Sequence, residues 1–467
     1  MTAEAAQIAA GAVIFTALFL SKEAITEEWM NIKLPEKVEY IIDTLQNAGY
    51  EAYAVGGCVR DSILGREPDD WDVTTSAKPT SVKALFARTV DTGIQHGTVT
   101  VMLGKEGFEV TTYRIDGEYE DCRHPKEVTF TASLREDLRR RDFTINAMAY
   151  NERDGLVDAF GGIQDLQKKR IRCVGQARER FTEDALRMMR AVRFSAQLGF
   201  EIEEETKAAI ECLAPSLRNV SAERIQTELV KLVTSPHPDR FRIAYETGIT
   251  AVIFPEFDAA MKMPQNHPHH KYSVGEHILH SMEAIAADKV LRLVMLFHDL
   301  GKPLCRTVDE NGVDHFKGHA AVSAEIAENV MRRLKFDNDT KNKVTKLVFY
   351  HDYHIAETPK GVRRAANKIG TELFPLLFPI KRADIAAQSG YMESEKLAAL
   401  TYLEALYQEI LEAEECLSLK DLAVTGRDLI DAGMQPGREI GEKLSELLEL
   451  VLEKPERNTK EYLLTQI

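Results

Sequence analysis

The hydrophobic pattern of this chain changes at about residue 165, and that change limits the folds open to it. Residues 30 to about 150 alternate between helix-like spacing and the two-residue alternation typical of strands. After about residue 165 the strand signals fade, and one amphipathic helical segment follows another. The sequence therefore predicts an α+β multidomain protein, in which a small mixed β-sheet head is followed by helical domains.

The chain has 467 residues, which is too long for one ordinary domain. A segment rich in Pro, His and Asn, residues 262–273, has the composition of a linker, and its HPHH run fits a linker better than a metal site. The expected parts are an N-terminal extension (1–29), the head (30–160), a helical neck and body (161–265), a helical unit dense in His and Asp (272–390) and a helical tail (391–467).

The first apolar stretch, Ala5 to Leu20, is short for a bilayer span and has no preceding Lys or Arg. Met30 opens a natural amphipathic helix, so we interpret the residues before it as the product of a wrongly assigned start codon. The six cysteines form no CxxC pair and fit reduced thiols. We therefore expect a cytoplasmic protein that does not associate with membranes.

Acidic residues outnumber basic ones by 74 to 59, and the net charge is −15. A chain this acidic cannot coat nucleic acid over its whole surface, so a nucleic-acid site must be a local basic patch. Basic residues cluster where the head meets the neck. They are Arg139, Arg140, Lys168, Lys169, Arg170, Arg172, Arg178 and Arg180.

Two aspartates, Asp70 and Asp72, lie two positions apart on a predicted strand, so their side chains share one face. A third carboxylate, Glu109, lies on one strand of a predicted hairpin. Two aspartates on a strand are, in isolation, usually a solvated face. Mg²⁺ binds one or two carboxylates together with substrate phosphates and water, so the set is also a candidate metal site.

Upstream of the aspartates, a predicted strand ends in Gly56 and Gly57 and a short helix follows. Glycines at such a turn let the backbone approach phosphate groups, and Arg60 beside them is a phosphate donor. A diglycine alone is usually only a turn. Its combination with the aspartates and the hairpin is far more specific.

A second candidate site lies in the segment TEDALRMMR, where Glu183, Asp184 and Arg187 share one face of a predicted helix with Thr182 as its N-cap. One interpretation is a pair of surface salt bridges of little energetic value. The other is a protein template, in which a carboxylate accepts from a base amine and a guanidinium donates to the ring. Cytosine and adenine both present an amino group, whereas uracil and guanine present a carbonyl, so such a pair would select CTP and ATP.

The stretch YAVGGCVRDSILGREPDDWDVTT resembles the signature of the CCA tRNA nucleotidyltransferase and bacterial poly(A) polymerase family, a branch of the polymerase-β-like nucleotidyltransferases. The resemblance extends from residue 30 to near the end of the chain. It implies a two-metal Mg²⁺ site at Asp70 and Asp72, with Glu109 as the third catalytic carboxylate. That site would activate a 3′-hydroxyl and stabilise the departing pyrophosphate.

The resemblance also implies a nucleotide pocket. In LRRRDFTINAM, Arg141 and Asp142 would contact the triphosphate and the ribose hydroxyl, while Asp184 and Arg187 would read the base. The full implied set is Gly56, Gly57, Arg60, Arg141, Asp142, Asn146 in support, Glu183 to position the arginine, Asp184, Arg187, and Arg190 on the phosphates.

Five segments of the second helical unit, EHILH, FHDLGKP, GHAAVS, FYHD and KRADIAAQ, resemble in their order the HD phosphohydrolase superfamily. The resemblance implies a divalent-metal site whose imidazole and carboxylate ligands suit Mg, Mn, Ni, Co or Fe. Similar domains either hydrolyse phosphates at RNA ends or only bind tRNA, and both interpretations stay open. The implied ligands are His277, His298, Asp299 and Asp384, with His319 and His351 for a second metal.

The sequence therefore predicts template-independent addition of CCA to tRNA, with the tRNA acceptor arm, CTP and ATP as partners and no binding of DNA. A charged loop at 114–130 favours full CCA addition or addition of A alone, and the acidic tail disfavours a poly(A) polymerase. A phosphohydrolase with a degenerate head and a non-catalytic scaffold are weaker alternatives, because Asp70 and Asp72 are intact. The chain is expected to be a monomer or a homodimer.

Overall fold

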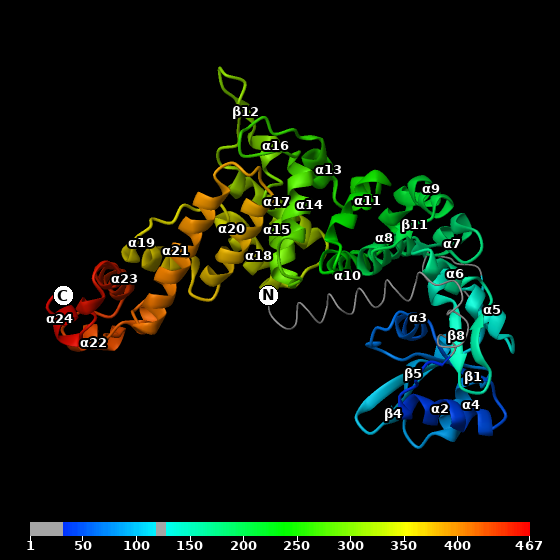
Figure 1. The fold of residues 1–467 in the computed structure, drawn as a ribbon. Helices are drawn as coiled ribbons and strands as arrows, with labels where there is room; N and C mark the ends of the chain where they lie inside the picture. The colour runs from blue at the N-terminus through cyan, green and yellow to red at the C-terminus, as the bar shows by residue number, and fades with distance from the viewer. Residues whose placement is uncertain (1–30, 118–127) are drawn as a thin grey trace. The chain divides into compact units, whose positions relative to one another are not determined.

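The computed structural model describes residues 31–117 and 128–467 (Figure 1). The predictions about residues 1–29, and most of the predicted loop at 114–130, lie outside the described residues. Contacts divide the chain into two compact units. The first comprises Met1–Ala191 with Phe200–Val220, and the second comprises Val192–Gly199 with Ser221–Ile467.

The first unit is built on the predicted small mixed sheet, which has seven strands in the order β3-β4-β5-β2-β1-β8-β9. Within this described sheet, β2 and β5 pair in parallel and the other neighbours pair antiparallel. The predicted hairpin is β4 and β5. The strands are β1 (Ala52–Val55), β2 (Val73–Thr75), β3 (Thr89–Gly93), β4 (Thr98–Leu103), β5 (Glu106–Thr112), β8 (Met148–Asn151) and β9 (Gly155–Asp158), with a separate pair β6 (Arg114–Asp116) and β7 (Val128–Phe130).

Helix α2 (Glu36–Asn47) shows why the first unit folds as it does. Val38, Ile41, Ile42 and Leu45 recur at helical spacing, all four are buried, and the helix contacts β1 and β2. The other helices and short strands of this part are α3 (Gly57–Ile63), α4 (Pro79–Leu85), α5 (Leu134–Arg139), α6 (Gly162–Gln167), α7 (Ala177–Glu183), α9 (Glu204–Leu213), β10 (Arg170–Ile171) and β11 (Glu201–Ile202). Helix α8 (Leu186–Leu198) begins in the first unit and continues into the second.

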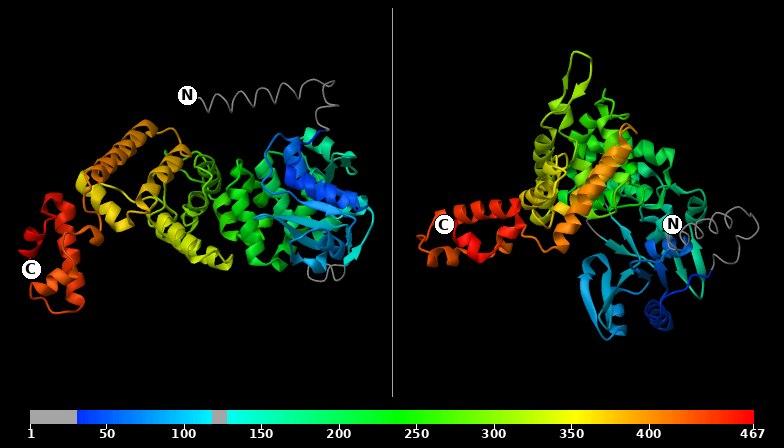
Figure 2. Two further views of the ribbon diagram at one scale, coloured as in Figure 1. Left: turned by 90° about the horizontal axis from the view of Figure 1, so that it is seen from below. Right: turned by 60° about the vertical axis from the view of Figure 1, so that its left-hand side comes forward.

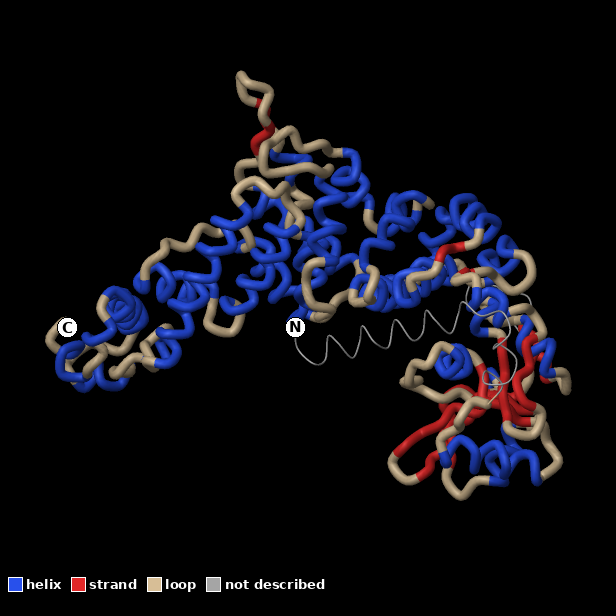
Figure 3. Tube along the Cα trace, viewed as in Figure 1, coloured by secondary structure: helices blue, strands red, loops and turns tan. Residues whose placement is uncertain are grey.

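The second unit is helical, as the pattern after residue 165 predicts, except for one strand pair, β12 (Thr307–Val308) with β13 (Asp314–His315) (Figure 3). This pair was not predicted, and it projects from the neighbouring helices (Figure 2, right). The helices up to the predicted tail are α10 (Ala222–Val233), α11 (Phe241–Glu246), α12 (Ile249–Ile253), α13 (Pro255–Lys262), α14 (Val274–Glu283), α15 (Lys289–Phe297), α16 (Lys302–Cys305), α17 (His319–Arg333), α18 (Asn338–Tyr350), α19 (Pro359–Ile369) and α20 (Leu377–Ala386).

The predicted tail is also helical and ends in a small core of its own, in which Leu429, Leu447, Val451 and Leu463 are fully buried. Among the residues with described coordinates, no helix is both long and apolar enough to cross a membrane. The helices of the tail are α21 (Glu393–Glu412), α22 (Gly426–Asp431), α23 (Arg438–Glu453) and α24 (Lys460–Leu464).

Candidate active site and metal centre

Asp70 and Asp72 lie in the loop between α3 and β2, not on the strand itself. The strand begins at Val73 because pairing with both β1 and β5 begins there. The predicted strand over both aspartates is therefore wrong in its bounds. The carbonyl oxygen of Asp72 still accepts a hydrogen bond from the backbone N–H of Val55 at 3.0 Å, so the end of the loop is fixed to the sheet.

The three predicted catalytic carboxylates influence one another electrostatically. Glu109 precedes the β5 residue that pairs with Val73, so it lies beside the end of this loop. Loss of water raises the pKa of Glu109, and the negative charges of Asp72 and Asp70 raise it further. Loss of water also raises the pKa of Asp72. The positive charge of Arg141 opposes this shift, and the negative charge of Asp70 adds to it. Carboxylates that repel one another in this way suit a divalent cation, which neutralises them.

Gly56 brings Arg141 close to these carboxylates. The φ angle of Gly56 is +90°, in the region that favours glycine, and a Cβ atom there would lie 2.8 Å from Nη1 of Arg141. A Cβ on Gly57 would meet nothing closer than 3.7 Å. Burial lowers the pKa of Arg141, and the carboxylates of Asp137 and Asp72 oppose that shift. The first glycine of the pair, and not the second, is therefore the one that the site requires.

Arg60, Asn146, Asp142 and Arg190 form a chain of polar contacts. Nη1 of Arg60 donates to Oδ1 of Asn146 at 2.7 Å, and Nδ2 of Asn146 donates to Oδ1 of Asp142 at 3.3 Å. Nε of Arg190 donates to Oδ2 of Asp142 at 2.7 Å. Burial opposes ionisation of Asp142, but Arg190 and Arg187 overcome it and lower its pKa to about 2. Phosphate contacts by Arg60 and Arg190 stay predictions. In this structure Arg190 positions Asp142 directly, and Arg60 does so through Asn146.

The predicted template residues lie at a break between two helices. Helix α7 ends at Glu183 and α8 begins at Leu186, so the prediction of one continuous helix with Thr182 as its N-cap is wrong. Thr182 instead donates to the carbonyl oxygen of Arg178 within α7. Asp184 takes the capping role, since its Oδ1 accepts the N–H of Leu186 at 3.1 Å. Aspartate favours such caps because its short side chain reaches nearby backbone N–H groups.

Arg187 is held in one orientation by several partners. Its Nη1 lies 2.6 Å from Oε2 of Glu183, the ion pair that the sequence spacing predicts. Nη1 also donates to the carbonyl oxygen of Arg180, and Nη2 donates to that of Arg140, both at 3.1 Å. The chain therefore supplies a preorganised guanidinium next to Asp184. Its contact with a base stays a prediction.

Part of the predicted basic patch is engaged within the protein. Arg140 pairs with Asp137 at 2.9 Å, Arg172 pairs with Asp165 at 2.8 Å, and Arg180 pairs with Glu183. These arginines therefore support the head and neck directly. Arg139 makes a longer, exposed ion pair with Glu136 at 3.9 Å. Any RNA footprint depends more on the other members, Lys168, Lys169, Arg170 and Arg178.

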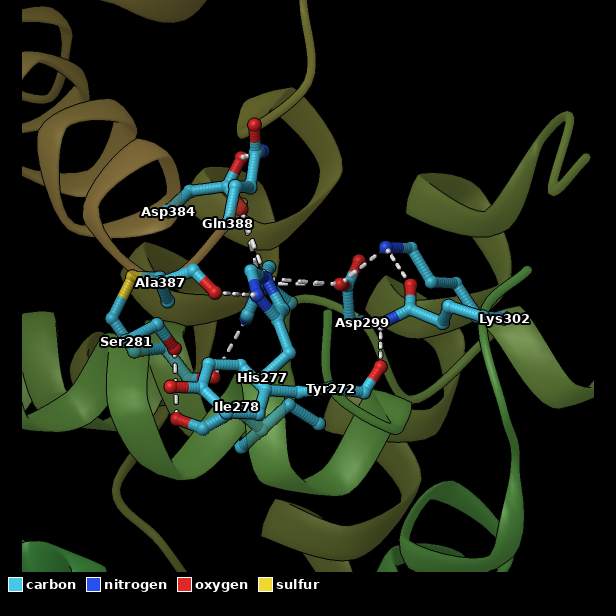
Figure 4. Close-up of polar contacts among 12 residues, drawn as sticks. Tyr272, His277, Ile278, Ser281, Asp299, Lys302, Asp384, Ala387 and Gln388 are labelled. Atoms are coloured by element: carbon cyan, nitrogen blue, oxygen red, sulfur yellow. Dashed lines mark hydrogen bonds and ion pairs between the residues drawn. The ribbon is translucent and has the colours of Figure 1, made fainter. Parts of the chain in front are cut away.

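The six predicted metal ligands of the second unit converge on one centre. Figure 4 shows three of them, His277, Asp299 and Asp384. Among the described residues, two sets of three ligand atoms lie within 4.8 Å of one another, and both include Asp299. Asp384 joins the first set, because its Oδ1 lies 2.9 Å from Nε2 of His277. The two sets are His277, His298 and Asp299, and Asp299, His319 and His351.

The four imidazoles of this centre are held in the tautomer that binds metal. Each Nδ1 lies within 3.2 Å of a backbone carbonyl oxygen, which can only accept a hydrogen bond. Nδ1 therefore carries the proton, and each Nε2 presents a lone pair to the centre. These Nε2 atoms face each other in pairs, His277 with His298 and His319 with His351, both at 3.2 Å. Facing lone pairs with a shared carboxylate fit one or two divalent cations.

The charge states of His298, His351 and Asp299 agree with this fit. For His319, burial lowers the pKa, but the hydrogen bond to Asp299 overcomes this and raises it. Burial lowers the pKa of His298 and that of His351, the latter to about 3, so both are neutral ligands at pH 7. Burial opposes ionisation of Asp299, but His298 and Lys302 overcome it and hold the pKa of Asp299 well below its usual range. Nζ of Lys302 lies 2.6 Å from Oδ2 of Asp299.

A cavity of about 440 Å³ opens beside the metal ligands. His267 and His270 line it together with Lys302 and Lys317. The segment at 262–273 is irregular after α13, as predicted, but its HPHH run belongs to the wall of this cavity and is not a bare linker. The sequence signal was the histidine run itself. Composition alone could not place it beside Asp299, His319 and Asp384, which lie far along the chain.

Three segments of the chain match known protein families. Residues 52–172 match the "Poly A polymerase head domain", residues 199–261 match the "Probable RNA and SrmB- binding site of polymerase A", and residues 316–467 match "tRNA nucleotidyltransferase domain 2 putative". His277, His298 and Asp299 lie between the second and third matches.

Comparison with individual proteins gives similarity over nearly the full length. The CCA-adding enzyme of Lactobacillus helveticus (strain DPC 4571) is 37% identical over 424 residues, which cover 90% of this chain and 94% of that enzyme. That of Geobacillus thermodenitrificans is 50% identical over 214 residues, 46% of this chain and 53% of the relative. The crystal structure of the Bacillus stearothermophilus CCA-adding enzyme in complex with CTP superposes with a TM-score of 0.69 at 30% identity, covering 93% of this chain and 97% of that one.

Proposed function

This chain belongs to the CCA-adding enzymes, and we propose that it extends the 3′ end of tRNA with the sequence CCA by using CTP and ATP. The observation that carries this proposal is that Glu109 lies beside the end of the loop that holds Asp70 and Asp72. The negative charges of Asp70 and Asp72 raise the pKa of Glu109 there, and Arg141 lowers that of Asp72. The acceptor arm of tRNA would be recognised by its shape, because an A-form helix hides its bases in a deep groove.

The carboxylates and Arg141 would share the work of nucleotidyl transfer. Asp70, Asp72 and Glu109 would hold Mg²⁺, which would supply charge neutralisation for the attacking 3′-hydroxyl and the departing pyrophosphate. Nε of Arg141 is buried and has no hydrogen-bond partner among the described residues, which fits it to hold a triphosphate oxygen. Asp142, ionised because Arg190 pairs with it, would accept from the ribose hydroxyl.

Base selection would rest on Asp184 and Arg187. Glu183 and the two carbonyl oxygens orient the guanidinium before any nucleotide arrives, so little side-chain entropy is lost on binding. A carboxylate acceptor beside a guanidinium donor complements cytosine and adenine. The same pair would leave uracil and guanine with a carbonyl facing a carboxylate, which costs affinity.

Incubation of tRNA that lacks its 3′ CCA with single labelled nucleotides tests the proposal. We expect CTP to be incorporated first, ATP to follow, and UTP and GTP to be rejected. Failure to incorporate CTP and ATP, or equal incorporation of UTP, would contradict it. A matched substrate that already ends in CC separates full CCA addition from the alternatives of A addition and poly(A) synthesis, because an A-adding enzyme would extend only this second tRNA.

We further propose that the second unit carries an HD-type metal centre that hydrolyses phosphate esters. The observation behind it is the set of four imidazoles whose Nδ1 protons are all taken up by backbone carbonyls. The four imidazoles, Asp299 and Asp384 would hold a divalent metal, which would supply Lewis acidity at neutral pH. Release of phosphate from p-nitrophenyl phosphate in the presence of Mn²⁺ or Ni²⁺ tests it. If wild-type protein binds neither metal, the helices serve only as a scaffold for tRNA.

A further inference from the structure

We propose that residues 265–270 form the substrate-binding wall of the metal centre, and that His270 holds a phosphoryl oxygen of an anionic substrate beside the metal ligands. This inference rests on the proposed phosphohydrolase function. It assigns a binding role to a segment whose composition alone suggests a linker.

One side of the segment is tied to the strand pair β12–β13 and to α16. The backbone N–H of Asn266 donates to Oδ2 of Asp314 at 2.8 Å, and the N–H of Asp314 donates back to the carbonyl oxygen of Asn266 at 2.9 Å. Oε1 of Gln265 accepts from Nζ of Lys302 at 2.9 Å. Lys302 also pairs with Asp299, so this side chain connects the segment to a metal ligand.

The other side of the segment is tied to the connection between α20 and α21. Ser389 donates from its backbone N–H to the carbonyl oxygen of His269 at 2.8 Å, and from its hydroxyl to that of Pro268 at 2.6 Å. Nζ of Lys396 donates to Nδ1 of His269 at 2.9 Å. Ordering a segment costs conformational entropy, and a passive linker needs none of these bonds. The anchoring fixes where the next residue, His270, lies.

His270 is placed at the cavity with its ring uncommitted. Its ring centroid lies 5.5 Å from that of His277, and the two rings are nearly perpendicular. Among the residues that the structure describes, no hydrogen bond holds its imidazole, and its Nδ1 is buried without a partner. Buried polar groups in proteins are nearly always paired, so an unpaired one at a cavity marks a group that a ligand can use.

The chemistry of the residues that line the cavity identifies the class of ligand. One group of lining residues consists of metal ligands, and a second group consists of His267, His270, Lys302 and Lys317. Asp314 and Asp352 also line the cavity, and Arg306 pairs with Asp314 at 2.9 Å. An anion that coordinates metal through one oxygen and accepts hydrogen bonds through its others fits both groups. Phosphate esters have this arrangement of acceptor oxygens, and charge-assisted hydrogen bonds to them are strong.

Binding of inorganic phosphate to the Mn²⁺-loaded full-length protein, measured by isothermal titration calorimetry, tests the inference. We expect His270→Ala to keep the wild-type Mn²⁺ stoichiometry and to bind phosphate about tenfold more weakly, since one hydrogen bond to a charged group is lost. His270→Asn retains an amide N–H at this position and should recover part of that affinity. His237→Ala is the matched control, because it removes an exposed histidine outside the cavity lining.

The outcomes separate this inference from the function on which it rests. Equal phosphate affinity in wild type and His270→Ala would overturn the inference and leave the metal centre intact. Loss of Mn²⁺ from His270→Ala would make this residue a metal ligand, which also overturns it. If Mn²⁺-loaded wild type binds no phosphate, the phosphohydrolase function fails together with the inference.

Discussion

Asp72 carries a negative charge that the fold disfavours. Because its pKa is raised, the folded chain binds its proton more tightly than the unfolded chain does. Its contribution to stability is therefore greatest below the ordinary carboxylate pKa and is lost as the pH rises through the raised value. At neutral pH the charge is a net cost to folding. Ionised groups kept at such a cost are typical of active sites.

We expect Asp72→Asn to reduce nucleotide addition by about 10³-fold or more, because several kcal/mol of metal-derived charge stabilisation are lost. The midpoint of thermal unfolding of the metal-free variant should stay the same or rise, since the repulsion among the carboxylates is relieved. Asp69→Asn, an exposed neighbour, is the control and should change neither quantity. Single-turnover addition to tRNA and differential scanning fluorimetry measure the two effects, and full activity in Asp72→Asn would refute the catalytic assignment.

The two adjacent glycines offer a second test at the residue scale. Gly56→Ala places a Cβ atom 2.8 Å from Nη1 of Arg141 and strains a backbone whose φ is +90°. We expect it to cost about 1–2 kcal/mol of unfolding free energy and to weaken binding of CTP. Gly57→Ala meets no such contact and begins a helix, so it should be neutral. Chemical denaturation gives the unfolding free energies of the two variants, and titration gives their affinities for CTP. Equal values in both variants would show that the Arg141 side chain shifts to make room for the added Cβ atom.

At the scale of elements, the break between α7 and α8 combines a structural and a proposed functional role in Asp184. Its Oδ1 caps α8 by accepting the N–H of Leu186. A simple alanine substitution removes both the cap and the carboxylate, so it cannot separate the two roles. Asparagine caps helices about as well as aspartate but also presents an N–H donor, so it changes mainly the base-reading chemistry.

We expect Asp184→Ala to lower the unfolding free energy by about 1 kcal/mol and to relax the preference for CTP over UTP. Asp184→Asn should keep the stability and still relax the preference. The measurements are denaturant unfolding and the ratio of CTP to UTP incorporation into tRNA lacking CCA. An unchanged ratio in both variants would remove Asp184 from the nucleotide pocket.

The candidate metal ligands of the second unit lie at helix ends far apart in sequence. His298 follows α15, His319 opens α17 and His351 follows α18. A metal that binds only the folded state should stabilise these helices by about 2.7 kcal/mol at a hundredfold excess over its Kd. We expect Mn²⁺ to raise the thermal midpoint and EDTA to reverse the rise. His298→Ala should abolish the shift, whereas His280→Ala, on the surface of α14, should retain it; a shift that survives in His298→Ala would place the metal elsewhere.

On the scale of the whole molecule, the two sets of candidate metal ligands belong to different compact units. Substitutions without shared contacts usually have additive effects. We therefore expect Asp70→Asn to abolish CCA addition while Mn²⁺ binding by the second unit is unchanged. His298→Ala should weaken that Mn²⁺ binding and leave CCA addition intact. Calorimetric metal titration and tRNA extension on both variants check this, and loss of both functions in either variant would show that the two sites are coupled.

Local pattern explains which parts of the fold could be foreseen. The β4–β5 hairpin, α2 and the helical second unit follow from hydrophobic periodicity, which depends only on near neighbours in the chain. The bounds of β2 and the break at Asp184 could not be foreseen in the same way. A strand ends where its partners end, and one capping hydrogen bond outweighs the small propensity difference that would continue the helix.

By itself the sequence determined the class of fold, the chemical types of the site residues and the order of the motifs, because these depend on residue identity and short spacing. Only the tertiary structure decided that Gly56 and not Gly57 admits Arg141, that Asp142 is paired with Arg190, and that backbone carbonyls set the tautomers of four histidines. It also decided that His270 lies at the metal centre. Such contacts join residues far apart in the chain, and packing, not local periodicity, brings them together.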